Sequence, residues 1–259
     1  ERNSLIECCQ YDKFEFVEGD INNKELIKNH IKKFDIIIPL AAIVGAPASE
    51  RNALLSRQTN LESIKDLLNN LSTKQMLIYP TTNSGYGVGK KDQYCTEETP
   101  LNPISEYGRN KVEAEKLILD RENSISFRLA TLFGYSYRMR SDLLVNNLVT
   151  TALKDRKLSI FQPEFRRNFI HIDDVIGALN LLIKSKKNNN EIFNIGTGKS
   201  TNLKDLIKII SKILNKKIII KQIRGTRGDF NFCAANIKKI SKKLKFKPKW
   251  NLIKGLSNV

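Results

Sequence analysis

The chain has 259 residues, of which 41% are hydrophobic and 27% are charged, a composition typical of a soluble globular protein with one large domain or a domain and a smaller lobe. No apolar run approaches the roughly 20 residues of a membrane-spanning helix, and we expect no membrane partner. The formal net charge of +17 would suit a nucleic acid, but lysine recurs along the whole chain beside asparagine and isoleucine. We therefore interpret the charge as a compositional bias that still favours a phosphate-bearing small substrate, and we do not expect nucleic-acid binding.

The first half of the chain alternates short apolar runs with helical patterns. The run at 35–45 is almost continuously apolar, as in a strand buried on both faces. Strands and helices in alternation predict a parallel sheet with crossover helices. In chain order, the expected elements are a strand at 14–20, a helix at 23–34, a strand at 35–45, a helix at 50–71, a strand at 75–83, a helix at 104–121 and a strand at 124–134.

After about residue 135 the alternation becomes less regular. We predict a main α/β domain at 1–135 and a smaller α/β lobe at 136–259, with some segments of the second part returning to the main sheet. The expected elements of this part are a helix near 141–155, strands around 158–161 and 168–172, a helix near 173–185, a strand at 191–196, a helix at 202–214, a strand at 217–221 and a short helix at 236–244.

The cysteines and histidines form no metal-binding pattern. No CxxC pair and no Cys/His ligand spacing occurs, so we expect no structural zinc and no other metal. Unpaired cysteines fit a reducing compartment, and we predict a cytoplasmic protein. The residues concerned are Cys8, Cys9, Cys95 and Cys233, together with His30 and His171.

The segment "GTGKST" (196–201) resembles a phosphate-binding P-loop. The full signature needs a glycine five residues before the glycine of the GK pair, and that position is Phe193. We therefore interpret the segment as a strand-to-helix turn, with Thr201 or Asn202 as the N-cap of the next helix.

His171, Asp173 and Asp174 could suggest a metal site. We instead expect the two aspartates to cap and begin a helix, because negative charge suits the N-terminal end of the helix dipole.

Tyr107 and Lys111 are four residues apart in the helix predicted at 104–121 and therefore project from one face. A free tyrosine has a pKa of about 10 and is a poor base at neutral pH. A neighbouring ammonium group favours the phenolate and lowers that pKa. Such a tyrosine could take a proton from a hydroxyl group while hydride leaves the same carbon.

The hydroxyl-rich segment 81–84 follows the strand predicted at 75–83. In open α/β sheets, ligands bind at the carboxyl ends of parallel strands. We therefore expect this strand end to supply a hydroxyl donor beside the Tyr107–Lys111 pair.

Several further segments extend this pattern over almost the whole chain. They are "EGDI" (18–21), "PLAAIVG" (39–45), "TNLESIK" (59–65), "TTNSGYG" (81–87), "YGRNK" (107–111), "FRLATLFG" (127–134), "RRNFIHIDD" (166–174) and "FNIGTG" (193–198). Together they resemble the extended short-chain dehydrogenases/reductases, specifically the nucleotide-sugar epimerase/dehydratase group. The resemblance implies a Rossmann-like, doubly wound parallel sheet that binds NAD rather than NADP, a substrate-binding second lobe, a nucleotide-diphosphate sugar as substrate, and a homodimer.

The resemblance also implies site residues. Thr82, found by counting back four from Tyr86, would be catalytic together with Tyr107 and Lys111. Asn60 would steady the cofactor-binding loop, and Arg167 would contact the substrate diphosphate. The implied cofactor-binding residues are Asp20, Ile21, Leu40, Ala41, Ala42, Asn60, Tyr107, Lys111 and Ala130. The implied substrate-binding residues are Thr82, Asn83, Thr131, Asn146, Phe161, Arg167 and Arg227, the last preferred slightly over Arg224.

The chain departs from the family pattern in three places. The glycine-rich GxxGxxG turn, which holds the pyrophosphate with backbone amides, is absent, and we expect that the first βαβ unit is missing from the N-terminus. Pro39 replaces the usual histidine. Asn83 and Ser84 stand where 4,6-dehydratases carry acids, and an amide and a hydroxyl are poorly suited to that acid/base work, so dehydration is disfavoured.

The resemblance therefore implies oxidoreduction at C4 of the sugar, with 4-epimerisation as the first hypothesis. A 4-dehydrogenase and a 4-keto reductase remain alternatives, because the sequence does not show whether the keto intermediate can rotate. A non-catalytic NAD(P)- or RNA-binding protein is the alternative of another class, and a non-functional gene fragment is the third possibility.

Overall fold

The computed structural model describes residues 5–89, 93–137, 139–185, 190–223 and 232–257. Its main sheet has four parallel strands in the order β1-β2-β3-β7. The register pairs Ile36 with Met76, Leu77 with Ser124 and Ile125 with Glu191. The parallel sheet predicted from the alternating pattern is therefore confirmed. Its strands are β1 (Ile36–Ile37), β2 (Met76–Thr82), β3 (Ser124–Leu129) and β7 (Glu191–Ile195).

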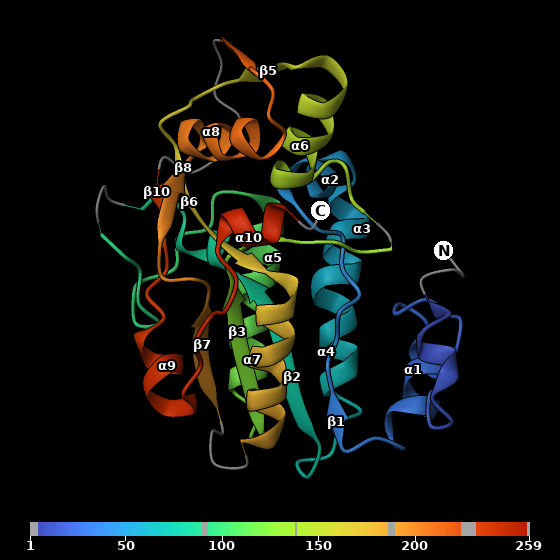
Figure 1. Cartoon of the computed structure of the whole chain (residues 1–259). Helices are drawn as coiled ribbons and strands as arrows, with labels where there is room; N and C mark the ends of the chain where they lie inside the picture. The colour runs from blue at the N-terminus through green and yellow to red at the C-terminus, as the bar shows by residue number, and fades with distance from the viewer. Residues whose placement is uncertain (1–4, 90–92, 138, 186–189, 224–231, 258–259) are drawn as a thin grey trace.

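Helices cover both faces of this sheet, as a doubly wound fold requires (Figure 1). Alternate residues of β2 serve opposite faces: Leu77 and Tyr79 join a core with the helices on one side, whereas Ile78 joins the core on the other. The first side carries α1 (Lys24–Ile31), α4 (Ser63–Leu68) and α5 (Glu106–Leu119); the second carries α7 (Ile172–Lys184) and α9 (Lys238–Leu244).

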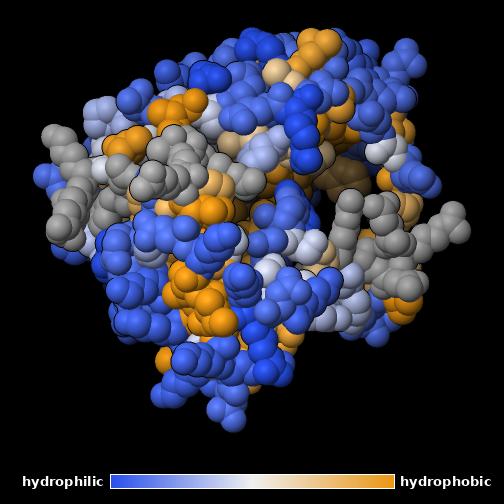
Figure 2. All heavy atoms as spheres, turned by 90° about the horizontal axis from the view of Figure 1, so that it is seen from above, coloured by the Kyte–Doolittle hydropathy of each residue, from blue (hydrophilic) through white to orange (hydrophobic). Residues whose placement is uncertain are grey.

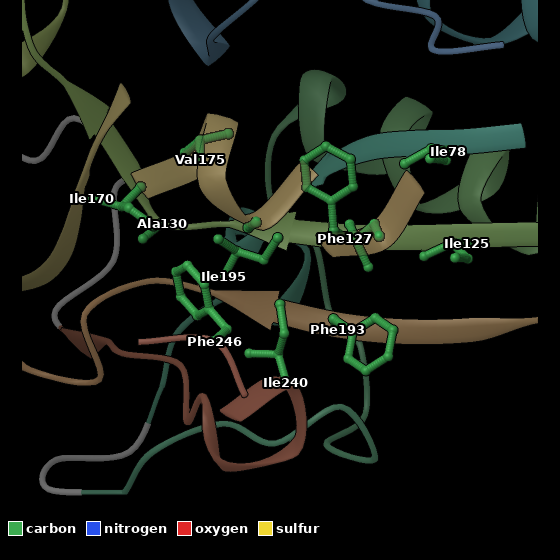
Figure 3. Close-up of a cluster of buried hydrophobic side chains, with 12 residues drawn as sticks. Ile78, Ile125, Phe127, Ala130, Ile170, Val175, Phe193, Ile195, Ile240 and Phe246 are labelled. Atoms are coloured by element: carbon green, nitrogen blue, oxygen red, sulfur yellow. The ribbon is translucent and has the colours of Figure 1, made fainter. Parts of the chain in front are cut away.

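Figure 3 shows the second core in close-up. Phe127 and Phe193 come from neighbouring strands, and apolar side chains of α7, α9 and the segment after α9 close over them. The labelled members from these helices and this segment are Val175, Ile240 and Phe246. This core draws on residues from both halves of the chain, so the division at residue 135 stays a prediction.

A second group of strands forms the lobe at the top of Figure 1. β6 lies between β4 and β10, in parallel with both, and pairs antiparallel with β8, while β5 pairs in parallel with β9. Seen from the end that carries α6 and α8, the surface is mostly hydrophilic around smaller apolar areas (Figure 2). The elements are β4 (Thr131–Phe133), β5 (Lys157–Ile160), β6 (Arg166–His171), β8 (Ser200–Asn202), β9 (Ile219–Gln222), β10 (Phe232–Cys233), α6 (Leu144–Asp155), α8 (Leu203–Ile213) and α10 (Leu252–Leu256).

Four predicted elements differ in the structure. The strand expected at 35–45 is confined to Ile36–Ile37, the two residues that pair with β2, and residues 38–45 form no strand. Residues 14–20 form no strand, because no described strand lies beside them to share backbone hydrogen bonds. The helix expected at 50–71 is broken at Asn52, whose side chain accepts a hydrogen bond from Leu55 N and begins a new helix. The broken helix consists of α2 (Ala46–Arg51), α3 (Ala53–Arg57), a π-helical turn η3 (Gln58–Glu62) and α4.

The strand expected at 124–134 also divides in two. It leaves the main sheet at Ala130, whose N–H still donates to Ile195 O at 2.9 Å, and continues as β4 beside β6. The apolar run at 124–134 therefore contributes one strand to each of two sheets.

The capping predictions have mixed outcomes. Asn202 caps α8 by accepting a hydrogen bond from Asp205 N at 2.7 Å, which confirms the helix turn proposed in place of a P-loop. The prediction that aspartates cap α7 is wrong, because His171 is the N-cap, but both Asp173 and Asp174 lie in its first turn as expected. Asp174 is buried and accepts from Lys249 N and Trp250 N, so it ties the C-terminal segment to α7. Among the described residues, none of the helices combines the length and the apolar character of a membrane-spanning segment.

Candidate active site

Tyr107 and Lys111 lie in the first half of α5. Ser105 begins this helix by accepting a hydrogen bond from Gly108 N at 3.1 Å. Tyr107 is half-buried, whereas Lys111 is almost wholly buried. The first turn of α5 packs on the turn after β2, since a Cβ on Gly108 would lie 3.7 Å from Ser84 O. The structure therefore brings the predicted pair to the carboxyl end of β2.

Thr82 is the last residue of β2 and is half-buried. Its hydroxyl accepts a hydrogen bond from Ser84 N at 3.1 Å and donates to Ser84 Oγ at 3.0 Å. These bonds fix Thr82 Oγ1 at the edge of the sheet where parallel strands end. The hydroxyl that the sequence predicts beside the Tyr107–Lys111 pair is thus held in a defined position.

Burial and one nearby charge shift the pKa of Tyr107 in opposite directions. Burial raises the pKa of Tyr107 to about 12, while the positive charge of Arg140 lowers it. Arg140 is held nearby by donating to Val44 O at 3.3 Å and by an ion pair with Asp142. The phenol is therefore neutral at pH 7 in the chain alone, and Tyr107 needs further positive charge to become a base.

The pKa of Lys111 shifts in the opposite direction. Burial lowers the pKa of Lys111 to about 7, although the negative charge of Glu115 raises it. The amine is therefore protonated less readily than that of an exposed lysine. Whatever keeps this amine charged is therefore decisive for any effect of Lys111 on Tyr107.

Asn60 fixes the loop that follows β1. Its side chain accepts from Ile43 N at 2.8 Å and donates to Ile43 O at 2.9 Å and to Ser56 Oγ at 3.2 Å. The side chain is fully buried, so these bonds replace those to water. In the loop that it holds, Leu40 and Ala41 are exposed and Ala42 is half-buried.

Replacing Asn60 with aspartate is expected to lower the free energy of unfolding by about 1–3 kcal/mol, because it removes two buried hydrogen bonds donated by the amide and buries a carboxylate in its place. Urea denaturation measures the change. Asn52→Asp is the matched control, since aspartate caps a helix as well as asparagine does. Equal stability of the Asn60→Asp variant and the wild type would contradict the role given to Asn60.

Three of the residues expected on the cofactor line one cavity. Asp20, Ile21 and Ala41 contribute to a cavity of about 330 Å³ beside α1. Asp20 Oδ1 accepts from Asn22 N at 2.8 Å, which orients the carboxylate. Ala130 behaves differently: its side chain lies in the core cluster, so a contact with a ligand is left to its backbone.

The residues expected on the substrate are more dispersed. Asn83 is buried and donates to Asn168 Oδ1 at 2.7 Å, and Asn146 donates to Arg140 O at 3.0 Å. Both amides therefore hold protein segments together. Thr131 in β4, Phe161 after β5 and Arg167 in β6 are half-buried, and Arg227, like its alternative Arg224, lies outside the described residues.

Sequence reasoning missed a buried polar network beneath α5. Arg128 Nη2 donates to Glu115 Oε1 at 2.6 Å, and Arg128 Nη1 donates to the Tyr86 hydroxyl at 2.9 Å. That hydroxyl donates to Asn194 Oδ1 at 2.7 Å, and Asn194 N donates to Glu97 Oε1. Two signals were available: an arginine inside an apolar strand needs an anion, and Glu115 follows Lys111 by one helical turn.

Residues 2–196 of the chain match the model of the NAD dependent epimerase/dehydratase family. The chain belongs to this family. It is 27% identical to the UDP-glucose 4-epimerase of Lactobacillus helveticus, over 92% of this chain and 79% of that protein. The resemblance stated from the motifs is thereby confirmed.

Solved structures agree in fold with this member of the epimerase/dehydratase family. The UDP-glucuronic acid 4-epimerase of Bacillus cereus, in complex with UDP-glucuronic acid and NAD, has a TM-score of 0.90 and 26% identity, covering 98% of this chain and 82% of that one. The dTDP-glucose 4,6-dehydratase of Bacillus anthracis, in complex with NAD, has a TM-score of 0.87 and 24% identity, covering 100% and 82%. The second likeness shows the fold alone.

Proposed function

We propose that this protein binds NAD and catalyses oxidoreduction at C4 of a nucleotide-diphosphate sugar, with 4-epimerisation as the reaction. The observation that carries the proposal is the position of Thr82, Tyr107 and Lys111 at one end of the parallel sheet, with Thr82 Oγ1 fixed by Ser84. Relatives named UDP-glucose and UDP-glucuronate 4-epimerases support it.

The residues present fit a dinucleotide at this edge of the sheet. Asn60 holds the loop after β1, and Asp20 and Ile21 line a cavity together with Ala41 from that loop. Tyr107 and Lys111 stand on α5, which packs on β2 and on the turn after it. We infer that the first group contacts the adenine half and that the pair lies beside the reacting half.

The proposed mechanism gives each residue one task. NAD, when bound, supplies the hydride acceptor and, for epimerisation, returns the hydride. Tyr107 removes the proton of the C4 hydroxyl and later restores it. The Thr82 hydroxyl turns from Ser84 Oγ to share a hydrogen bond with that hydroxyl, and the ammonium of Lys111 favours the phenolate of Tyr107.

Two observations favour epimerisation over dehydration. Asn83 donates its amide to Asn168, and Ser84 Oγ is the acceptor of the Thr82 hydroxyl. Neither position next to Thr82 offers a carboxyl group for removing water. Dehydratases occur among the relatives and neighbours, so the products must be identified directly.

The decisive experiment incubates the purified protein with NAD and a panel of UDP-, GDP-, CDP- and dTDP-sugars. NMR of the products and the absorbance of reduced cofactor are followed together. Epimerisation gives a new sugar without net reduction of the cofactor, while a 4-dehydrogenase accumulates both reduced cofactor and keto sugar. Absence of hydride transfer with every sugar, together with tight RNA binding, would overturn the proposal in favour of a non-catalytic binder.

Replacing Thr82 with alanine is expected to lower turnover by about 10²-fold, as for other lost hydrogen-bond donors at a reacting oxygen. Thr82→Ser keeps the hydroxyl and is the matched control, so it should retain most of the activity. Steady-state kinetics with the sugar found in the panel measures both variants. Equal losses in the two variants would remove Thr82 from the mechanism.

We also propose a cytoplasmic homodimer, on the cysteine pattern and the family resemblance. Light scattering on the purified protein measures the oligomeric state.

A further inference from the structure

The Lys111 ammonium lies against the face of an aromatic ring from the sheet. Nζ is 3.8 Å from the centroid of the Tyr79 ring, in the middle of β2. Lys111 is 4% exposed and Tyr79 is 1% exposed, so water has little access to either side chain. An ammonium is attracted to the negative face of an aromatic ring, and this attraction is strongest where both groups are desolvated.

The other groups near Lys111 do little to stabilise its positive charge. On its own helix, Glu115 is engaged by Arg128 of β3 and by Ser126 Oγ, so its negative charge is already paired. Tyr107 is neutral at pH 7, since the ordinary pKa of a phenol is about 10 and burial raises it further. The remaining charges near α5 lie on its outer side. They belong to Arg57, Glu62 and Lys65 of α3, η3 and α4, which pair with Glu113 or with one another. Their side chains are 36–46% exposed, so water screens them.

We propose that Tyr79 is a positioning residue, whose ring holds the charged ammonium of Lys111 in place beneath Tyr107. This inference rests on the proposed function only for its catalytic consequence, since the contact itself is a property of the fold. Lys111 has to be charged to favour the phenolate of Tyr107, and the ring favours that charged form in a site where burial disfavours it.

The hydroxyl of Tyr79 is not the group that acts. It is buried and has no hydrogen-bond partner among the described residues. Burial also raises the pKa of Tyr79 well above its usual value, so the ring stays neutral. Phenylalanine should therefore replace Tyr79 in this role, and an aliphatic side chain should not.

The direction of the titration follows from these contacts. Lys111 is charged below its pKa and neutral above it, and burial has already lowered this pKa to about 7. Removing the aromatic face takes away a group that stabilises the charged form. The pKa of Lys111 should then fall further.

The test measures Lys111 directly, in protein labelled with ¹³Cε-lysine. Lys111→Met identifies the signal of Lys111 by its absence. NMR titration of Tyr79→Phe should give the wild-type midpoint. Tyr79→Leu and Tyr79→Met, two aliphatic variants in case one folds poorly, should give midpoints lower by about one pH unit, a tenfold change in proton affinity.

A matched control separates this effect from lost packing. Phe127→Leu removes another fully buried ring from the core on the opposite face of the sheet, so it should destabilise the fold without moving the Lys111 midpoint. Unchanged midpoints in both aliphatic variants, or an equal shift in Phe127→Leu, would overturn the proposal.

Kinetics adds a second readout. In the pH profile of turnover, the alkaline midpoint should move to lower pH in Tyr79→Leu and stay in place in Tyr79→Phe. An unchanged alkaline midpoint in Tyr79→Leu would overturn the proposed effect of Tyr79 on catalysis. If the wild type turns over no sugar, the proposed function fails, while the NMR midpoints still decide whether Tyr79 holds the charge of Lys111.

Discussion

Tyr107→Phe is expected to lower turnover by about 10²–10⁴-fold, the usual contribution of a general acid–base group. The substitution removes only the hydroxyl that exchanges a proton with C4, so the ring still fills its place in the first turn of α5 and the protein should stay folded. Steady-state kinetics on the sugar identified by the panel measures the loss, and isothermal titration checks that the sugar still binds.

Tyr135→Phe is the matched control for this change. Tyr135 is 57% exposed, with its ring edge-on to that of Tyr137, and its loss of a hydroxyl should leave turnover near the wild-type value. A Tyr107→Phe protein that turned over as fast as the Tyr135→Phe protein would remove Tyr107 from the mechanism.

Glu115→Gln is expected to lower the free energy of unfolding by about 3–5 kcal/mol, because it leaves the buried guanidinium of Arg128 without its anion. The pair is among the most buried of the described charges, with side-chain exposures of 4% for Arg128 and 2% for Glu115. Both Nε and Nη2 of Arg128 donate to the carboxylate. Urea denaturation of the two proteins measures the difference.

Two further variants sharpen this result. Glu106→Gln breaks the exposed pair with Arg109 on the same helix and should cost no more than about 1 kcal/mol. The double variant Glu115→Leu with Arg128→Met replaces both buried charges by apolar groups and should recover much of the stability lost in Glu115→Gln. If Glu115→Gln cost no more than Glu106→Gln, the buried pair would not stabilise the fold.

Much of the candidate site is already predictable from local patterns. The spacing of Tyr107 and Lys111 places both on one helix face, and the helix that carries them begins at Glu106 after its N-cap Ser105, close to the predicted 104. The apolar run before Thr82 predicts the strand that ends there. These features depend on the period of a helix or strand and on capping, which act over a few neighbouring residues.

Other features depend on partners distant in the chain. Residues 14–20 have the composition of a strand but no described neighbour to pair with, and the run at 124–134 divides between two sheets at Ala130. Hydropathy indicates that such segments are buried or extended, but it carries no information about which strand lies beside them. Pairing is a property of the assembled sheet.

The environment of Lys111 shows the same limit. The sequence places Lys111 on the same helix face as Tyr107, and this spacing is enough to suggest a catalytic pair. Its burial, the ring of Tyr79 at 3.8 Å and the engagement of Glu115 by Arg128 come from β2 and β3, and they decide whether the amine is charged. Residue identity and local period follow from the chain itself, whereas a pKa depends on solvent exclusion and on neighbouring charges that only folding brings together.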